Sequence, residues 1–437
     1  MSEVNLSTEI VLTNILNPIN DLRCDFHPNY ALVLAKGKIV EFGESYKILK
    51  KYENKNAKII DRSKFICMPG FFDMHFHWVQ DDVRLMPKDS LLTWLSKYTW
   101  PYEAKFKSLD YTKKKVAKFA QELIKTGTFG GACYASIHPH TVDYAMENFV
   151  GNFVVGNVLM TMNSPKYLTQ SEANAIETVT ELSQKYKSGY AMTPRFAITT
   201  SPEVMEMGAN IARKNKSFIQ THLSETKDEI EFVLSIFKKI KGFEKVKTYT
   251  EIYQRSKVLG PKTIMGHGIY LNDNELKILA KTKTIICHCP TSNAPVSEQG
   301  LGSGLFDFRK TEKHKIRWAL GSDIGGGPYL SMFDVMRSFV VQNQKKKIKE
   351  ATYVKALYRA TLMGATILGV EKLTGNFKKN KQANFIFVDL KNIKANDSAE
   401  VVLKKIITST KNDRRQYDQL VREAIYLGKT IYTSISI

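Results

Sequence analysis

Short apolar segments separated by helix-type patterns recur through the middle of the chain. They lie at residues 71–77, 218–221, 263–266, 284–287 and 316–320. Between such segments, residues such as Val116, Phe119 and Leu123 recur at helical spacing, and Gly127 marks the end of that helix. Strands that alternate with helices form parallel sheets, and their strands are apolar because both faces are buried. The sequence therefore predicts an α/β fold whose middle is most simply a (β/α)8 barrel.

The two ends of the chain have a different, strand-rich pattern. Residues 31–35 and 39–43 flank a Lys36-Gly37-Lys38 turn, which is typical of a hairpin. Residues 384–389 and 430–435 have the same extended character near the C-terminus. We therefore predict a small β-sandwich domain that both chain ends build together, from residues 1–68 and 375–437, and we expect the barrel at residues 69–374.

The charge, hydropathy and cysteine content restrict the classes of function. The formal net charge is +21, but the lysines are spread along the chain and their densest runs lack the interleaved aromatics of a nucleic-acid groove. No apolar stretch is long enough to cross a bilayer, and residues 1–5 lack the features of a signal peptide. The five cysteines have no paired spacing. We expect a cytoplasmic protein that binds neither nucleic acid nor membrane.

Chemically distinctive residues stand at the ends of the predicted strands. His75 and His77 lie two positions apart on the first strand, so both side chains face the same way. Later strands end at His222, His267 and Asp323. The carboxyl ends of the strands of a (β/α)8 barrel converge on one site. Because imidazole and carboxylate ligands suit Zn²⁺ or Fe²⁺, the sequence predicts a catalytic metal site.

Glu225 follows His222 by three residues and is expected on a loop above the barrel mouth. Thr226 and Glu229 match a capping box, so the next helix begins after Glu225. From this loop the carboxylate is positioned to take a proton from an activated water and pass it to a substrate.

Each of these residues alone also has an ordinary structural explanation. His267 suits a hydrogen-bonded core histidine, Asp323 suits a helix N-cap, and Glu225 suits the first turn of a helix. Their joint occurrence, in order and each after a strand, favours the metal site. Two similar patterns are set apart because we do not expect them to bind the metal. His138-Pro139-His140 is expected on a loop, and Cys287-His288-Cys289 lacks a second pair of cysteines.

These motifs together resemble those of the amidohydrolase superfamily over nearly the whole chain. The resemblance rests on His75-x-His77, His222-x-x-Glu225, His267 and Ser322-Asp323. Further segments are similar to the guanine deaminases within that superfamily, namely residues 91–101, Gln80, residues 193–196, and residues 289–293 followed by 301–306. The departures are Trp100 in place of a usual phenylalanine, a longer connection at residues 294–300, and asparagines at positions 376 and 380.

The resemblance implies a metal-dependent aminohydrolase that converts guanine, a small-molecule substrate, to xanthine and ammonia. It also implies a homodimer with one Zn²⁺ per subunit, Fe²⁺ being the alternative. The implied metal ligands are His75, His77, His222 and Asp323, and the implied catalytic residues are Glu225, His267 and Asp323. The implied substrate contacts are Gln80, Arg195, Phe196, His222, Glu225, His267 and Asp323.

Elementary chemistry supports two of these substrate contacts. Arg195 offers a charged donor fork to the purine carbonyl, and Gln80 offers a donor and an acceptor on one amide. The alternative for Arg195 is pairing with a structural acid, and for Gln80 it is capping a loop. An aromatic side chain, Trp94 or Phe196, is expected to pack on the face of the base.

Several other functions remain as rivals. A sibling amidohydrolase would act on another aminopurine, 8-oxoguanine, a pterin or a triazine. A binuclear hydantoinase type is disfavoured because no lysine ends the strand around Arg195. A nucleic-acid base deaminase is disfavoured because its zinc signature is absent. A non-catalytic scaffold that keeps the fold predicts lost ligands, whereas every ligand position is present.

Overall fold

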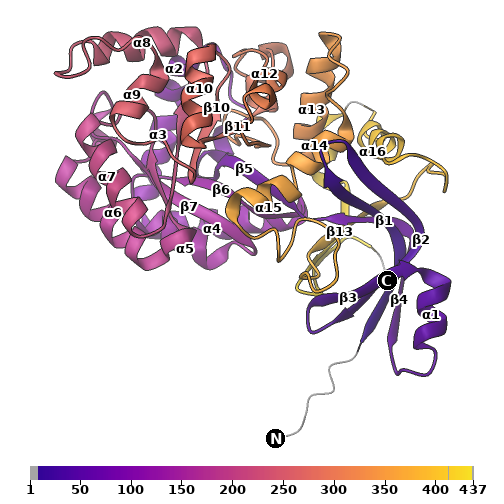
Figure 1. The fold of residues 1–437 in the computed structure, drawn as a ribbon. Helices are drawn as coiled ribbons and strands as arrows, with labels where there is room; N and C mark the ends of the chain where they lie inside the picture. The colour runs from indigo at the N-terminus through magenta and orange to yellow at the C-terminus, as the bar shows by residue number, and fades with distance from the viewer. Residues whose placement is uncertain (1–7, 412, 436–437) are drawn as a thin grey trace, which may run out of the picture. The chain divides into compact units, whose positions relative to one another are not determined.

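Two hydrogen-bonded sheets organise the strands of the chain (Figure 1). The computed structural model describes residues 8–411 and 413–435. One sheet has eight strands from the middle of the chain, and the other has seven strands from its two ends. This arrangement confirms the expected fold class, an α/β barrel accompanied by a smaller β-rich part.

The eight-stranded sheet follows the chain order from β5 to β12. Its neighbouring strands pair in parallel, as in the match of Gly266 with His222 and with Cys287. The strands are short and almost entirely buried, as expected for strands covered on both faces. They are β5 (Phe71–His77), β6 (Thr128–Ala135), β7 (Asn152–Leu159), β8 (Ala191–Pro194), β9 (Phe218–Leu223), β10 (Thr263–His267), β11 (Ile285–His288) and β12 (Trp318–Leu320).

The chain just beyond β12 closes this sheet onto β5. The backbone N–H of Asp323 donates to the carbonyl of His75 at 2.7 Å, and the N–H of His77 donates to the carbonyl of Ile324 at 3.3 Å. Asp73 reinforces the closure, because its carboxylate accepts from the backbone N–H of Ser322 at 2.8 Å and from the Ser322 hydroxyl at 2.5 Å. The first and last strands of the barrel are therefore joined at the site where the predicted metal ligands lie.

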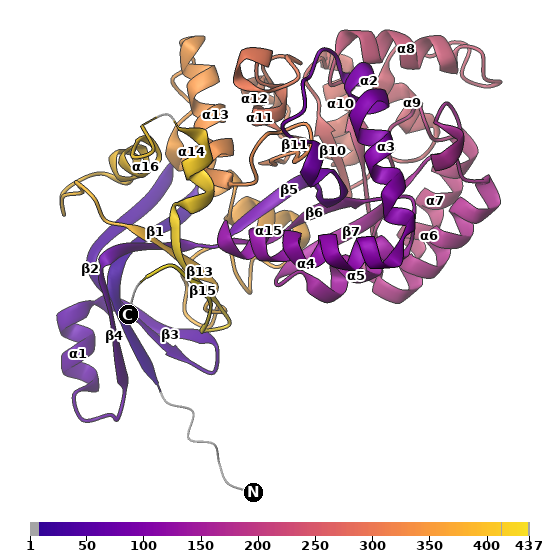
Figure 2. The same cartoon turned by 180° about the vertical axis from the view of Figure 1, so that it is seen from behind.

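Helices follow the barrel strands, and α4 and α5 lie outside strands β6 and β7 in Figure 2. Helix α8 begins at Lys227 behind a capping box of Thr226 and Glu229, as predicted. The strand expected from residue 316 begins only at Trp318, because the N–H of Ile316 donates to the carbonyl of Thr311 at the end of α12.

The helices of this middle region range from one turn to seventeen residues. The α-helices are α2 (Leu91–Trp94), α3 (Trp100–Glu103), α4 (Leu109–Lys125), α5 (His140–Asn148), α6 (Glu172–Tyr186), α7 (Pro202–Lys214), α8 (Lys227–Phe237), α9 (Tyr249–Arg255), α10 (Asp273–Thr282), α11 (Pro290–Asn293) and α12 (Phe308–Lys313). The short 3₁₀ or π segments are η1 (Trp78–Val83), η2 (Leu95–Thr99), η3 (Ala104–Lys107), η4 (Lys166–Leu168), η5 (Lys187–Gly189) and η6 (Val296–Glu298).

The seven-stranded sheet has the order β15-β14-β13-β4-β1-β2-β3. The predicted hairpin is present: β2 and β3 are antiparallel, and Gly37 in their turn has a φ of 70°. Parallel pairing of β1 with β4 and antiparallel pairing of β4 with β13 join the two chain ends. The strands are β1 (Glu9–Asn20), β2 (Arg23–Ala35), β3 (Lys38–Glu44), β4 (Lys58–Pro69), β13 (Phe385–Asp389), β14 (Val421–Tyr426) and β15 (Lys429–Thr433).

The remaining helices belong to the same parts of the chain as this sheet or directly precede its last strands. They are α1 (Ser45–Tyr52), α13 (Met332–Lys345), α14 (Tyr353–Arg359), α15 (Leu362–Leu368), α16 (Ala399–Thr408) and η7 (Arg414–Gln419). The core of the sheet includes Val11, Leu32, Cys67, Phe385 and Phe387, which come from both chain ends.

The described chain divides into two compact units. One contains the described residues up to Phe72, Gln121–Gly130 and those from Leu330 onward, and the other contains Asp73–Ala120 and Gly131–Tyr329. The boundaries expected from the sequence, after residue 68 and before residue 375, stay a prediction. Among the described residues, no helix has both the length and the apolar character needed to span a bilayer.

Candidate active site

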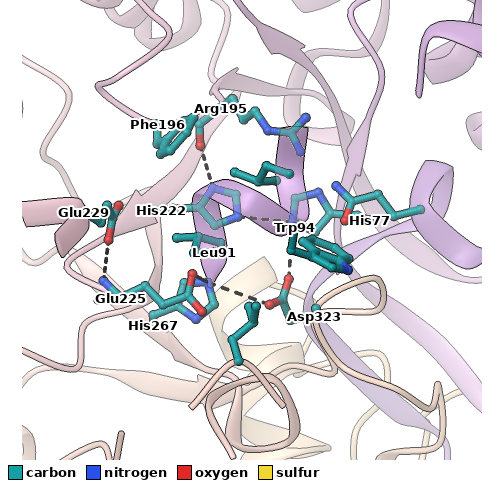
Figure 3. A pocket seen from close by; sticks show the side chains of 14 residues that line it. His77, Leu91, Trp94, Arg195, Phe196, His222, Glu225, Glu229, His267 and Asp323 are labelled. Carbon is teal, nitrogen blue, oxygen red and sulfur yellow. Dashed lines mark hydrogen bonds and ion pairs between the residues drawn. The ribbon is translucent and has the colours of Figure 1, made fainter. Parts of the chain in front are cut away.

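A pocket lies at the carboxyl ends of the barrel strands (Figure 3). Its wall combines ionisable side chains from the strand ends with apolar side chains from the segment 91–95 and from Phe196 and Leu301. The lining residues are His77, Gln80, Leu91, Trp94, Leu95, Arg195, Phe196, His222, Glu225, Glu229, His267, Leu301, Asp323 and Gly326. The pocket thus contains most of the residues that the strand-end argument singled out.

The predicted metal ligands converge at the base of this pocket. The Nε2 atoms of His75 and His77 lie 3.2 and 3.3 Å from Oδ1 of Asp323, and the Nε2 atoms of His77 and His222 lie 3.1 Å apart. Ligand atoms of a tetrahedral ion with bonds of about 2.1 Å lie about 3.4 Å apart. Within the described residues, Nε2 of the buried His75 has no hydrogen-bond partner. These donor atoms therefore have the spacing and the chemistry of a site for a divalent cation.

His267 also lies within reach of this centre. Judged by proximity alone, ligand atoms of His75, His222, His267 and Asp323 lie within 4.8 Å of one another. The hydrogen bonds of the imidazoles show that His222 and His267 carry their protons on different ring nitrogens. Nδ1 of His222 donates to the carbonyl of Arg195 at 2.5 Å, which leaves the lone pair of Nε2 facing the pocket. His222 thus has the tautomer that a metal requires.

The neighbours of His267 require the opposite tautomer. Nδ2 of Asn293 donates to Nδ1 of His267 at 3.1 Å and also to Oε1 of Glu225 at 3.3 Å. Because Nδ1 accepts, the proton of neutral His267 lies on Nε2, which is 3.5 Å from Oε2 of Glu225 and 3.9 Å from Oδ2 of Asp323. On this tautomer the N–H of His267 lies on the side of these two carboxylates, whereas Nε2 of His77 lies 3.1 Å from Nε2 of His222 and 3.3 Å from Oδ1 of Asp323.

Burial keeps the imidazoles of His77, His222 and His267 neutral. It lowers the pKa of His77 to about 4 and that of His267 to about 3, and it lowers the pKa of His222 well below its usual value. Burial alone would raise the pKa of Asp323, but its contacts with the imidazoles of His75 and His77 lower it well below the usual range. Neutral imidazoles and an ionised carboxylate are the forms that bind a metal.

Glu225 lies on the loop between β9 and α8, as expected, and its backbone N–H donates to Glu229 at 2.8 Å. Oε1 of Glu225 accepts from the hydroxyl of Ser303 at 2.9 Å and from Asn293, which leaves Oε2 toward His267. Burial, together with the nearby charge of Asp323, raises the pKa of Glu225 well above its usual value. A carboxyl group with a raised pKa is suited to accept and release a proton near neutral pH.

Gln80 and Arg195 share a buried carboxylate that the sequence did not single out. Nε2 of Gln80 donates to Oε1 of Glu103 at 2.8 Å, and Nη1 of Arg195 donates to Oε2 of Glu103 at 2.6 Å. The exposed fraction of Glu103 is 1%. Arg195 thus pairs with an acid and also lines the pocket. Pairing with a structural acid and contact with a substrate, the two alternatives for Arg195, are therefore compatible. No signal in the sequence marked Glu103, which lies two residues beyond the recognised segment 91–101.

The longer connection at residues 294–300 ends at the pocket. It contains the short helix η6, and Leu301, directly after it, lines the pocket. Asn293 precedes the connection and Ser303 follows it closely, and both donate to Glu225. Phe196 and Trp94, the two aromatics expected beside the base, also line the pocket.

Neither of the two patterns that were set apart contributes a residue to the lining of the pocket. His140 begins α5, and its Nε2 lies 2.8 Å from the carbonyl oxygen of Phe106. His138 is not among the residues that line the pocket. Cys287 and Cys289 are fully buried, and all five cysteines are free thiols. Of the two His-x-His patterns, only the first contributes a histidine, His77, to the lining of the pocket.

Close packing of β10 against His75 gives a test of the centre. A Cβ atom at Gly266 would lie 2.5 Å from Cε1 of His75, which is an overlap. The Gly266→Ala variant should therefore displace His75, bind less metal and lose most of its activity, as measured by elemental analysis and turnover. Gly260→Ala is the control, because its Cβ would meet only Oγ1 of Thr263 at 3.8 Å. Full metal content in Gly266→Ala would contradict this account of His75.

Comparison with known proteins agrees with this geometry. A model of the amidohydrolase family matches residues 66–418. Guanine deaminase of Escherichia coli strain K12 is 32% identical over 404 residues, which is 88% of each chain. The solved structure of E. coli guanine deaminase aligns with a TM-score of 0.86 and 28% identity, over 98% of this chain and 100% of that one. Guanine deaminase from C. acetobutylicum, solved with bound guanine in the active site, aligns with a TM-score of 0.84 and 28% identity over the same shares.

The family match covers the whole barrel, and the structural match to E. coli guanine deaminase, which covers 98% of the chain, extends to the sheet from the chain ends. The chain therefore belongs to the amidohydrolase family, and within it to the guanine deaminase group.

Proposed function

We propose that this protein hydrolyses guanine to xanthine and ammonia. The observation that carries the proposal is the position of Arg195 and Gln80 in the same pocket as Glu225 and the histidine–aspartate centre. The similarity to guanine deaminases, one of them solved with guanine bound, supports the same substrate. Guanine plus water gives xanthine plus ammonia, so the reaction needs a proton acceptor, a proton donor and an activated water.

Recognition of the base is assigned to the side of the pocket formed by Arg195, Gln80 and two aromatics. The guanidinium of Arg195 donates to the purine carbonyl, and the amide of Gln80 hydrogen-bonds to the edge of the ring. Trp94 and Phe196 flank the base with apolar surface. This arrangement holds the carbon that bears the amino group toward the histidine–aspartate centre.

We assign the metal-binding role to His75, His77, His222 and Asp323. These residues fit a divalent ion by donor type and by spacing, and zinc is proposed, with Fe²⁺ as the alternative, because imidazole and carboxylate ligands suit both ions. When bound there, the ion supplies a positive centre that makes water acidic enough to ionise near neutral pH.

Proton transfer is assigned to three side chains of the pocket. Oε2 of Glu225 accepts the proton of the attacking water and delivers it to a ring nitrogen of the base. The Nε2–H of His267 donates a hydrogen bond to the oxygen that attacks the ring. Asp323, through Oδ2, accepts the remaining proton of that oxygen and passes it to the amino group, which leaves as ammonia.

A substrate panel tests the proposal. The purified, zinc-loaded protein is incubated with guanine, 8-oxoguanine, adenine, a pterin and a triazine, and ammonia release and product identity are measured. We expect guanine to have the highest kcat/KM and to yield xanthine. Failure to deaminate guanine would refute the proposal, and turnover of another member of the panel would identify a sibling activity.

The remaining expectations are proposals of the same kind. A homodimer is supported by the family resemblance, and light scattering of the purified protein tests it. A cytoplasmic setting is supported by five free cysteines, which suit a reducing compartment.

A further inference from the structure

The carboxylate of Glu103 joins the two side chains that face the base. Its two oxygens are used separately: Oε1 accepts from Gln80 at 2.8 Å and Oε2 accepts from Arg195 at 2.6 Å. All three residues are almost completely buried, with exposed fractions of 1 to 2%. Glu103 itself is not among the residues that line the pocket, so it acts on the pocket only through its two partners.

The chemistry of a carboxylate fixes how each partner is oriented. An ionised carboxylate only accepts hydrogen bonds, so the amide of Gln80 must turn its NH₂ group toward it. On the other side of the amide, Gly325 lies so close that a Cβ atom there would be 2.2 Å from Oε1 of Gln80. Gly325 also has a φ of 112°, a conformation that favours glycine. The amide is therefore confined between Glu103 and Gly325 in a single orientation.

Arg195 is oriented by the same carboxylate. Nη1 is bound to Glu103, and among the described residues no other side chain accepts from the guanidinium. A planar guanidinium that is held at one nitrogen presents its remaining N–H groups in fixed directions. The backbone carbonyl of Arg195 is itself held by Nδ1 of His222, so the residue is fixed at both ends.

The local fold explains how Glu103 reaches this position. The segment starts with α2, whose Leu91 and Trp94 line the pocket, and continues through the π-helical η2 into α3, which ends at Glu103. The wider π turn changes the direction in which later side chains point. One continuous segment thus supplies both the pocket wall and the carboxylate behind Gln80 and Arg195.

We propose that Glu103 is a positioning residue that holds Gln80 and Arg195 in one fixed arrangement and so selects purines with a carbonyl beside the reacting edge. This inference rests on the proposed function. It extends base recognition from the two contacting side chains to a buried carboxylate that touches no part of the substrate.

The variant Glu103→Gln tests the inference, because it keeps the shape of the side chain and removes the charge. The glutamine amide at position 103 can both donate and accept, so the side-chain amide of Gln80 can also adopt the flipped orientation. We expect the KM for guanine to rise about tenfold or more, with a smaller change in kcat, because a contact that binds substrate and transition state alike is weakened. Metal content should stay at the wild-type level.

The control is Glu275→Gln, which removes the charge of another buried carboxylate in the same unit of the fold. Glu275 accepts from Thr250 at 3.0 Å and from the backbone N–H of Asn272 at 3.0 Å, away from the pocket. We expect its KM to stay near the wild-type value. Glu103→Asp, which keeps the charge but is too short to reach both partners, is a second variant with an intermediate expected KM.

A double-mutant cycle separates positioning from a merely structural role. If Glu103 acts through Arg195, the Glu103→Gln change should raise the KM much less in the Arg195→Met background than in the wild-type protein. Additive effects, or a wild-type KM in a folded Glu103→Gln or Glu103→Asp protein, would overturn the inference. If the wild-type protein itself leaves guanine unchanged, the proposed function fails instead, so the two failures are distinguishable.

Discussion

The Glu225→Gln variant is expected to keep its metal and to lose about a hundredfold or more in kcat. Glutamine preserves the hydrogen bonds that Oε1 accepts from Ser303 and Asn293, so the loop should keep its position. It has no group that can accept and release a proton, which is the role assigned to Oε2. Steady-state kinetics with guanine and elemental analysis of the same preparation measure both parts of this prediction.

The matched control for this variant is again Glu275→Gln, because Glu275 is buried and accepts backbone hydrogen bonds at a helix start, outside the pocket. Its kcat should remain near that of the wild-type protein. An active Glu225→Gln enzyme would remove Glu225 from the proton-transfer steps. Loss of metal from Glu225→Gln would show instead that this carboxylate belongs to the metal-binding set.

The second large effect separates His77 from His267. Proximity alone groups His267 with the metal ligands, whereas the hydrogen bond from Asn293 gives it a proton on Nε2. We therefore expect His77→Asn to lose most of its metal and all detectable activity. His267→Asn should retain its metal and lose turnover, because only a proton donor is removed. Metal content after dialysis and kcat with guanine are the two measurements.

Either result is informative about the centre. Metal loss in His267→Asn together with metal retention in His77→Asn would reverse the assignment of ligand and proton donor. Restoration of activity to His77→Asn by excess zinc would still support His77 as a ligand, because a weakened site binds when the ion is abundant.

The strand-end residues were predictable because their signal is local and periodic. His75 and His77 share a face with a period of two, and the ends of parallel barrel strands must converge. The capping box of Thr226 and Glu229 likewise depends on neighbouring residues only, and it correctly gave the start of α8. These rules needed no knowledge of distant contacts.

Other features depend on contacts that no local pattern reveals. Glu103 meets Arg195 across 92 positions of sequence, and it lies in a four-residue helix that is too short to show periodicity. The choice between His77 and His267 as a ligand depends on which imidazole nitrogen accepts from Asn293. The parallel pairing of β1 with β4 in the sheet from the chain ends could not be predicted either, because hairpin signals indicate only antiparallel pairing of consecutive strands.

The seam between the first and last barrel strands has a consequence for how the protein matures. Asp73 and Ser322, which hold the seam, are 249 positions apart, and the donors of the centre come from both sides of it. A nascent chain that has not yet been synthesised past Asp323 cannot present the complete donor set. Metal uptake at the proposed site would therefore require a chain that is complete through Asp323, and an ion bound there would add its binding free energy to the closure of the barrel.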